Sequence, residues 1–301
     1  MALSQEVLDN LAFANQMGFD KMHLAPADQT REMMKHAPKN SNPTQVGEVI
    51  DTTITENNIP VRIYIPEGHG IFPSISFFHG GGFTLMSLDT HDEICRQLCA
   101  RTNSILMSVD YALAPENPYP AGINDCVNAT KWFINNANQY NGDGSKIAVV
   151  GDSAGGYMAI SVAQKLILEG INLKAQVVVY PVTDHYSSGH SSWHENKEGY
   201  ILSADMMKWF WDNFITDPTK FDEASPLRTK NLEGLAPAFI ATANYDPLRD
   251  EGKAYAEKLE ASGVEVVYEN YENVHGFYGT GKMGQALMNK SVAFLIQKFK
   301  E

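Results

Sequence analysis

The sequence contains no long hydrophobic run. A helix that crosses a membrane needs about 18 or more consecutive apolar residues, and no stretch of this chain approaches that length. The first twenty residues, MALSQEVLDNLAFANQMGFD, also lack the basic start and the continuous apolar core of a secretory signal peptide. We therefore expect a cytoplasmic protein without stable membrane association.

Basic residues are scarce relative to acidic ones. The chain has 23 Lys and Arg against 36 Asp and Glu, which gives a formal net charge of −13. Nucleic acids and anionic membranes carry negative charge and repel such a protein. No run of Lys and Arg is long enough to form a local basic patch. The composition therefore disfavours nucleic acid as a partner.

Cysteine and recognisable metal-ligand patterns are scarce as well. Three cysteines cannot all pair within one chain, and because none lies in a C-x-x-C motif we expect buried free thiols at Cys95, Cys99 and Cys126. One polar stretch offers four possible metal ligands, but their spacing matches no standard zinc arrangement. They are Asp184, His185, His190 and His194. We therefore expect no metal site.

What the chain does have is an alternation of short β-branched runs with longer helical patterns. The expected strands are Val46–Thr55, Val61–Ile65, Ser74–Phe78, Ser104–Asp110, Lys146–Val150, Ala175–Tyr180, Ala238–Ala243 and Val264–Tyr268. The expected helices are Thr90–Thr102, Gly122–Gln139, Ala154–Glu169, Glu251–Ser262 and Gly284–Lys300. A chain of 301 residues is long enough for one large α/β domain, and we predict a single domain over residues 1–301.

The order of these elements predicts a mostly parallel eight-stranded sheet flanked by helices. The later strands are short, apolar and separated by helices, which is typical of a parallel sheet covered on both faces. The first two strands are joined around Glu56–Pro60 and are expected to form a hairpin, so the sheet is mixed. The last strand, Val264–Tyr268, is a candidate sheet edge, where pairing with a second copy would form a homodimer.

Two regions fall outside this alternation, residues 1–45 and residues 185–229. The first is helical and then becomes a polar loop, KHAPKNSNPTQ, and the second is rich in Ser, His and aromatic residues. A long insertion between sheet strands is often a lid or a substrate-binding element, although an ordinary helix packed on the core would give the same pattern. The second region contains a dense apolar cluster made of Met206, Met207, Trp209, Phe210, Trp211 and Phe214.

The stretch IAVVGDSAGGYMA carries the strongest chemical signal. It reads as a strand, then G-D-S-A-G, then a helix, which is the setting of the G-x-S-x-G nucleophile elbow. Ser153 would lie on a sharp turn with its hydroxyl above the sheet. Gly151 and Gly155 are expected because side chains there would collide with the neighbouring strand and helix. A tight turn without chemical function is the alternative interpretation.

A serine hydroxyl needs a base to accept its proton, and the base needs a carboxylate to orient it. In this strand–turn–helix setting the partners should follow the serine in the order acid, then histidine, after late strands. Asp246 follows the strand Ala238–Ala243, and His275 follows the last strand. His275 is also the only histidine after His194. Ser153, Asp246 and His275 are therefore the candidate catalytic residues.

An acyl-transfer site also needs donors for the negatively charged oxygen of the tetrahedral intermediate. The strand Ser74–Phe78 leads directly into a histidine and three glycines, whose backbone N–H groups can face inward. We expect the N–H groups of Gly81, Gly82 and Ala154 to form the oxyanion hole. Four further residues are expected to support the site through hydrogen bonds, namely His79, Gly80, Asp152 and Glu251.

With HGGGF, GDSAGG, DPLRDEG and HGF all present, the sequence resembles the hormone-sensitive-lipase-like family of α/β-hydrolases, the bacterial family IV esterases. The resemblance extends over residues 75–277 and includes YALAPENPYPA at Tyr111–Ala121. It implies an α/β-hydrolase fold with a helical cap formed by about 1–45 and 185–229. It also implies a serine carboxylesterase without a cofactor, in which Ser153 is the nucleophile, His275 the general base and then acid, and Asp246 its orienting group.

The implied substrate is a small acyl ester of short to medium chain length. An amidase or deacetylase with the same triad is an alternative, and a non-catalytic ligand receptor is a more distant one. The sequence departs from the family at Ala112, where arginine is usual, and at Asn117, where histidine is common. Arginine offers five donors in a planar group, so its loss predicts a less firmly held loop.

Overall fold

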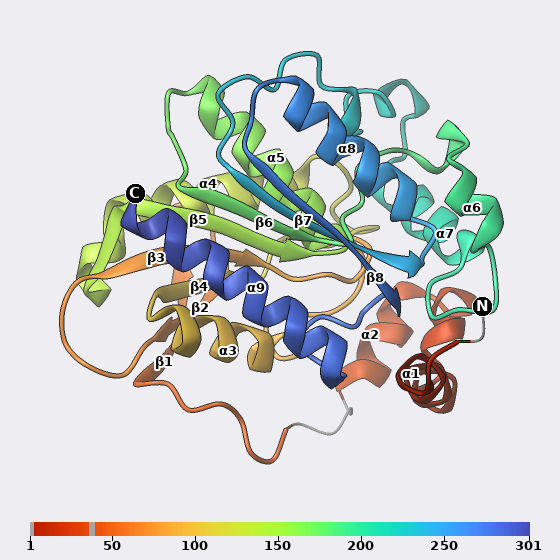
Figure 1. Ribbon diagram of the computed structural model, residues 1–301, viewed down its shortest axis with the longest axis horizontal. Helices are drawn as coiled ribbons and strands as arrows, with labels where there is room; N and C mark the ends of the chain where they lie inside the picture. Colours follow the sequence, from red (N-terminus) through yellow and green to blue (C-terminus); the bar gives the residue numbers. More distant parts are fainter. Residues whose placement is uncertain (1–2, 36–39) are drawn as a thin grey trace.

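A mixed eight-stranded sheet forms the centre of the computed structural model, which describes residues 3–35 and 40–301 (Figure 1). Its strands are β1 (Glu48–Ile54), β2 (Ile59–Ile65), β3 (Phe72–Phe78), β4 (Ile105–Val109), β5 (Gly142–Asp152), β6 (Ala175–Val179), β7 (Ala238–Tyr245) and β8 (Val266–Val274). Their order across the sheet is β1-β2-β4-β3-β5-β6-β7-β8. All eight predicted strands are therefore present.

The two ends of the sheet differ in strand direction. β1 and β2 form the predicted antiparallel hairpin, and β2 also pairs antiparallel with β4. From β4 to β8 every neighbouring pair is parallel. The five residues of β4, ILMSV, and the five of β6, AQVVV, are all buried, as expected for central strands covered on both faces. The prediction of a mixed, mostly parallel sheet is confirmed.

Helices cover both faces of this sheet. The helices are α1 (Gln5–Met17), α2 (Ala27–Lys35), α3 (Asp92–Thr102), α4 (Ala121–Asn136), α5 (Ala154–Leu168), α6 (Ser191–Glu195), α7 (Ala204–Phe214), α8 (Arg249–Ala261) and α9 (Gly281–Lys300). In Figure 1, α3 and α9 lie on one side of the sheet and α4, α5 and α8 on the other. Two hydrophobic clusters, one on each face, make up the core.

The last strand is longer than predicted. Its pairing with β7 begins at Ala238↔Val266 and continues through Ala243↔Tyr271 to Tyr245↔Val274. The sequence prediction ended this strand at Tyr268, because the polar residues that follow read as a loop, whereas an edge strand tolerates polar residues on its exposed face. His275 consequently follows the strand directly, and β8 lies at the sheet edge, as predicted.

The elements outside the α/β alternation gather near the carboxyl ends of the parallel strands. Figure 1 shows α1 and α2 beside α6 and α7 at that end of the sheet. Short 3₁₀ helices complete both regions, and they are η1 (Phe19–Leu24), η3 (Tyr186–Ser188), η4 (Pro218–Lys220) and η5 (Pro226–Arg228), with η2 (Ala137–Tyr140) after α4. Part of the predicted polar loop, residues 36–39, lies outside the described residues.

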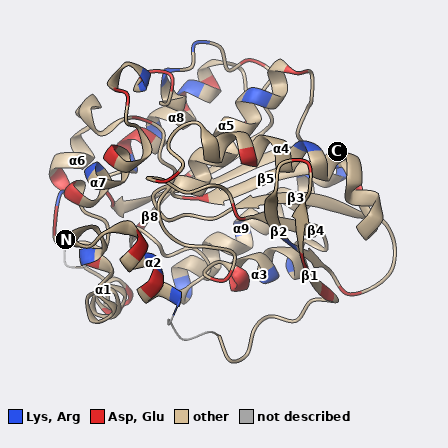
Figure 2. Cartoon of the chain, turned by 180° about the vertical axis from the view of Figure 1, so that it is seen from behind, with Lys and Arg blue, Asp and Glu red and all other residues tan. Residues whose placement is uncertain are grey.

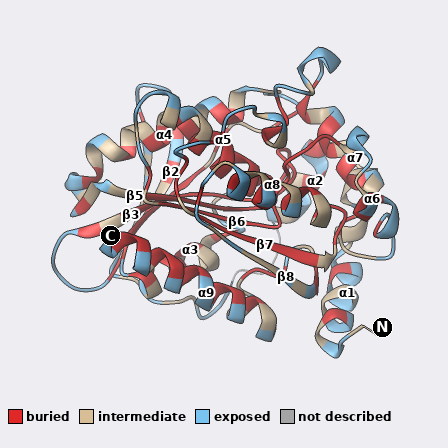
Figure 3. Ribbon diagram, turned by 45° about the horizontal axis from the view of Figure 1, so that its top comes forward, coloured by how far each residue is buried: buried red, intermediate tan, exposed pale blue. Residues whose placement is uncertain are grey.

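The two off-pattern regions differ in burial. α1 buries only Val7 and Ala14, whereas α7 buries five large side chains, those of Met206, Met207, Phe210, Trp211 and Phe214. In Figure 3, α1 is mostly exposed, whereas the central strands are buried. The apolar cluster of the insertion therefore packs inward.

The distribution of charged residues and the hydropathy of the helices agree with what the sequence composition predicts. In the view of Figure 2, Lys and Arg are interspersed with Asp and Glu over the outer helices and loops. Within residues 3–35 and 40–301, no helix is long and apolar enough to cross a membrane. Cys95, Cys99 and Cys126 are buried free thiols, as predicted.

Candidate active site

Ser153 lies on the sharp turn between β5 and α5. Its backbone has φ 55° and ψ −122°, a region that costs a non-glycine residue about 1–3 kcal/mol. The turn needs glycine on both sides, because a Cβ at Gly151 would overlap the Gly155 carbonyl, and one at Gly155 would overlap the Phe78 carbonyl. The serine is thus held in a strained position at the carboxyl edge of the sheet.

Ser153, His275 and Asp246 form one chain of hydrogen bonds. Ser153 Oγ lies 2.9 Å from His275 Nε2, and His275 Nδ1 lies 2.6 Å from Asp246 Oδ2. Because a carboxylate can only accept, Nδ1 carries the proton and leaves Nε2 free to accept from the serine hydroxyl. The serine is 6% exposed, the histidine side chain 11% and the aspartate 0%. The three residues predicted from the sequence are brought together.

Both oxygens of Asp246 are occupied. Oδ2 accepts from His275, and Oδ1 accepts from the backbone N–H of Leu248 at 2.9 Å. The backbone carbonyl of Asp246 accepts from Asn196 Nδ2 at 3.0 Å, and the same amide reaches the Asn244 carbonyl at 3.2 Å. We call residues 244–251 the Asp246 loop. Asn196 belongs to the insertion, and sequence reasoning missed it because no local pattern marks it.

The predicted oxyanion residues lie on two segments that meet at the serine. Gly81 and Gly82 have φ of +109° and +58°, conformations that L-residues rarely adopt, and Ala154 begins α5. We call residues 79–84 the glycine loop. Among the hydrogen bonds of the described residues, none has the backbone N–H of Gly81, Gly82 or Ala154 as its donor. These three N–H groups therefore stay the candidate donors to a substrate oxygen.

Side chains hold the glycine loop from the sheet side. His79 is fully buried, its Nδ1 donates to the Gly80 carbonyl at 2.7 Å, and its ring stacks on Tyr111 with centroids 4.5 Å apart. Tyr111 Oη in turn donates to the His79 carbonyl at 2.7 Å. Burial, together with the neighbouring His91, lowers the pKa of His79 to about 3, so the ring is neutral. His79 thus braces the loop.

Asp152 joins the glycine loop to a histidine that sequence reasoning missed. Its Oδ1 accepts from the Gly80 N–H at 3.2 Å and lies 3.2 Å from His91 Nε2. Burial alone would raise the pKa of Asp152, but the neighbouring histidines, first among them His91, outweigh it and hold that pKa below its usual value. His91 immediately precedes α3 and has no motif spacing that would have identified it.

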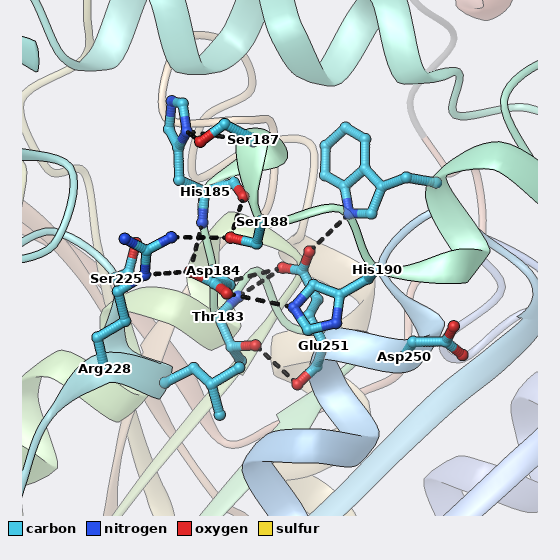
Figure 4. Close-up of polar contacts among 12 residues, drawn as sticks. Thr183, Asp184, His185, Ser187, Ser188, His190, Ser225, Arg228, Asp250 and Glu251 are labelled. Carbon is cyan, nitrogen blue, oxygen red and sulfur yellow. Dashed lines mark hydrogen bonds and ion pairs between the residues drawn. The ribbon is translucent and has the colours of Figure 1, made fainter.

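Glu251 lies in a separate polar network (Figure 4). Its carboxylate accepts from the backbone N–H groups of Thr183 at 2.8 Å and Asp184 at 3.2 Å, and from Trp193 Nε1 at 2.9 Å. Burial raises its pKa to about 8. Glu251 therefore fastens Trp193 and the residues just before the insertion to α8, and none of the hydrogen bonds given for the described residues joins it to Ser153, so its predicted support of the site is indirect.

The four residues considered as metal ligands have other surroundings than a metal site would give them. Asp184 accepts from Arg228 Nε at 2.8 Å and lies 3.2 Å from His190 Nε2, so its carboxylate lies between a guanidinium and an imidazole (Figure 4). His185 stacks on Phe221 with centroids 3.8 Å apart, and His194 lines a cleft between η1 and α6. Over the described ranges, 3–35 and 40–301, no three His, Cys, Asp or Glu side chains group as metal ligands.

Comparisons with known proteins agree with this geometry. A family model described as the α/β-hydrolase fold matches residues 75–279. The chain is 42% identical to the carboxylesterase NlhH of Mycobacterium tuberculosis over 228 residues, which is 73% of this chain and 71% of that protein. It is 34% identical to an ethyl acetate hydrolase of Pseudomonas putida over 259 residues, covering 81% of this chain and 80% of the relative.

A solved structure extends the similarity over the whole chain. The thermostable esterase from Pseudomonas putida ECU1011 superimposes with a TM-score of 0.93 at 33% identity, covering 99% of this chain and 98% of that one. The agreement includes the regions outside the family model, residues before 75 and after 279. The fold predicted from the sequence motifs is confirmed.

Proposed function

The chain belongs to the hormone-sensitive-lipase-like esterases of the α/β-hydrolase fold and is a carboxylic ester hydrolase, and from this premise we propose that Ser153 is its nucleophile and that it cleaves short- to medium-chain acyl esters. The observation that carries the proposal is the hydrogen-bond chain from Ser153 through His275 to Asp246. Three groups with these distances and burials have the geometry of a catalytic triad.

The reaction proceeds in two halves. Ser153 Oγ attacks the ester carbonyl while its proton passes to His275 Nε2, and Asp246 stabilises the imidazolium that forms. The tetrahedral intermediate collapses as His275 returns the proton to the leaving alcohol, so an acyl-enzyme remains. Water, deprotonated by His275, then attacks the acyl carbon, and release of the acid restores the serine. No cofactor is needed for these steps.

The N–H groups of Gly81, Gly82 and Ala154 bind the negatively charged oxygen in both halves. The support for this assignment is their placement beside Ser153 and their lack of any donor role in the described hydrogen bonds. The helix dipole of α5 adds positive potential at the same point. Loss of a single such donor typically costs about 10²–10³ in kcat.

A short acyl group fits the surroundings of the glycine loop. Phe210 of α7 packs so closely on Gly82 that an added Cβ would overlap its ring. The similarity to an ethyl acetate hydrolase points in the same direction. The cap, about residues 1–45 and 185–229, would then close the acyl site, with α7 as one wall. Pairing through β8 and a cytoplasmic location stay predictions.

Hydrolysis of p-nitrophenyl esters from acetate to palmitate, with Ser153→Ala beside the wild type, tests the proposal. We expect activity that peaks at short chains and falls by about 10⁴–10⁶ in kcat in the variant. Activity retained by a folded Ser153→Ala protein would contradict the assignment. Matched anilides in the same assay separate ester from amide preference, since an amidase would turn over both at comparable rates.

A further inference from the structure

We propose that Arg31, in helix α2 of the N-terminal region, is a positioning residue that holds the glycine loop in place for catalysis. The inference rests on the proposed function, because it concerns the donors of the oxyanion hole. Arg31 does not touch the proposed triad; it acts through Thr84 and Ala114.

The guanidinium of Arg31 binds two backbone carbonyls and one carboxylate. Nε donates to the Thr84 carbonyl at 2.6 Å, and Nη2 donates to the Ala114 carbonyl at 2.5 Å. Nη1 and Nη2 also grip the two oxygens of Glu116 at 3.0 and 2.9 Å. The arginine side chain is 22% exposed, so most of it is withdrawn from water. A planar group with five donors is needed to make all of these bonds at once.

The two carbonyls belong to segments that are already joined. Thr84 ends the glycine loop, and its N–H donates to the Gly81 carbonyl at 3.1 Å. Ala114 donates its own N–H to the Phe83 carbonyl at 2.9 Å. Arg31 therefore completes a clamp around the turn that presents the N–H groups of Gly81 and Gly82. Removing it leaves these two carbonyls without this donor, which favours a shifted loop.

This clamp accounts for the departure at Ala112. The absence of an arginine there predicted a loosely held loop at Tyr111–Ala121. Among the described residues, the cationic side chain that bonds to this segment is Arg31, which arrives from a helix about 80 positions earlier in the chain. The N-terminal region thus contributes to the chemistry as well as to covering the site.

The expected signature of a positioning role is a change in kcat. Donors that are misplaced by a fraction of an ångström stabilise the transition state less, while ground-state binding of the ester changes little. We expect Arg31→Ala to lower kcat by about 10- to 100-fold with KM close to wild type. Arg31→Lys keeps the charge but cannot reach both carbonyls and the carboxylate, so its kcat should be intermediate.

The experiment measures kcat, KM and thermal unfolding for these two variants with p-nitrophenyl acetate, beside Lys35→Ala as the matched control. Lys35 is an exposed cation on the same helix whose ion pair is with Glu32, away from the glycine loop. Guanidinium chloride at low millimolar concentration is then added. We expect it to restore part of the kcat of Arg31→Ala, and sodium chloride at equal concentration to restore none.

Three results would overturn the proposal: kcat of Arg31→Ala equal to that of Lys35→Ala, a rise in KM alone, or an activity loss that only follows the unfolded fraction. If Arg31→Ala does not fold, Arg31→Lys decides by the same criteria. Failure of the proposed function is distinguishable, because then the wild type would lack ester turnover or Ser153→Ala would retain it.

Discussion

The two regions proposed as the cap, about residues 1–45 and 185–229, secure different halves of the proposed active site by different means. The insertion binds the Asp246 loop mainly through Ser192, Trp193 and Asn196, with one exposed ion pair between Glu195 and Arg249. The N-terminal region binds the glycine loop through one partly exposed arginine. Burial determines what each attachment contributes, since a buried hydrogen bond is costly to break and an exposed ion pair contributes little.

The attachment of the insertion runs along the short helix α6 and the residue after it. Ser192 Oγ donates to the Pro247 carbonyl at 2.6 Å, and its N–H donates to Asp250 at 2.8 Å. Trp193 donates to Glu251, and Asn196 to the carbonyl of Asp246. Because these bonds are buried, the Asp246 loop and the insertion should unfold together, whereas the arginine clamp should affect catalysis more than stability.

The largest expected effect comes from the half of the site that the insertion holds, the Asp246 loop. Asp246→Asn removes the carboxylate that fixes the tautomer of His275, and kcat should fall by about 10⁴-fold without loss of the fold. Steady-state kinetics with p-nitrophenyl acetate measures it. Asp250→Asn is the matched control, since it lies on the same loop but bonds to Ser192 and Arg249. Equal losses in both variants would contradict the assignment of Asp246.

On the glycine-loop side, Gly82→Ala should lower kcat by about 10²–10³-fold, because its φ of +58° and the Phe210 ring both oppose a Cβ and the N–H would be displaced. Gly170→Ala is the matched control: it has a similar φ of +76°, but a Cβ there meets nothing within 4 Å. It should lose only about 1 kcal/mol of stability and keep its kcat. Kinetics and urea unfolding of both variants separate the effect of backbone strain from that of a steric collision with Phe210. A wild-type kcat in Gly82→Ala would refute the role of this loop.

The buried attachment of the insertion predicts a stability effect. Asn196→Ala leaves the carbonyls of Asn244 and Asp246 without their amide donor and should cost about 1–3 kcal/mol in the free energy of unfolding. Asn213→Ala removes an amide that bonds to the Trp209 carbonyl of its own helix and should cost less. Urea unfolding at neutral pH compares the two. Equal costs would show that the insertion is not fastened to the Asp246 loop through Asn196.

Glu251 predicts a pH dependence of stability. Burial raises the pKa of this carboxyl from its ordinary 4.5 to about 8, so the folded protein holds a proton that the unfolded chain releases between these values. Its contribution to stability therefore falls as pH rises from about 4.5 to about 8. Glu251→Gln cannot titrate, and the difference in unfolding free energy between wild type and Glu251→Gln should decline over that range. A difference in unfolding free energy that does not change with pH would contradict the raised pKa of Glu251.

The sequence was sufficient for the parts of the site that follow local rules. A strand, a tight glycine turn and a helix indicate Ser153 as the candidate nucleophile, and the chain order after late strands indicates Asp246 and His275 as its candidate partners. The strands were recognisable because buried parallel strands are short apolar runs. The length of β8 was not recognisable, because the exposed face of an edge strand carries polar residues that are also common in loops.

The contacts that hold the site could not be read from the sequence, because they join residues far apart in the chain. His91 reaches Asp152, Asn196 reaches Asp246, and Arg31 reaches Thr84 and Ala114. None has a spacing or a neighbouring pattern that marks it. The departure at Ala112 was visible, but its compensation depends on how α2 packs, which only the folded structure provides.

The most direct test of the account is to catch the acyl group on the serine. Wild-type protein is mixed with excess p-nitrophenyl acetate, quenched in acid during turnover, digested and examined by mass spectrometry. The account predicts one acetyl group on Ser153 in the peptide that contains GDSAGG, and none in Ser153→Ala. Acetylation of a different residue that accounts for turnover, or full ester hydrolysis by Ser153→Ala, would contradict it.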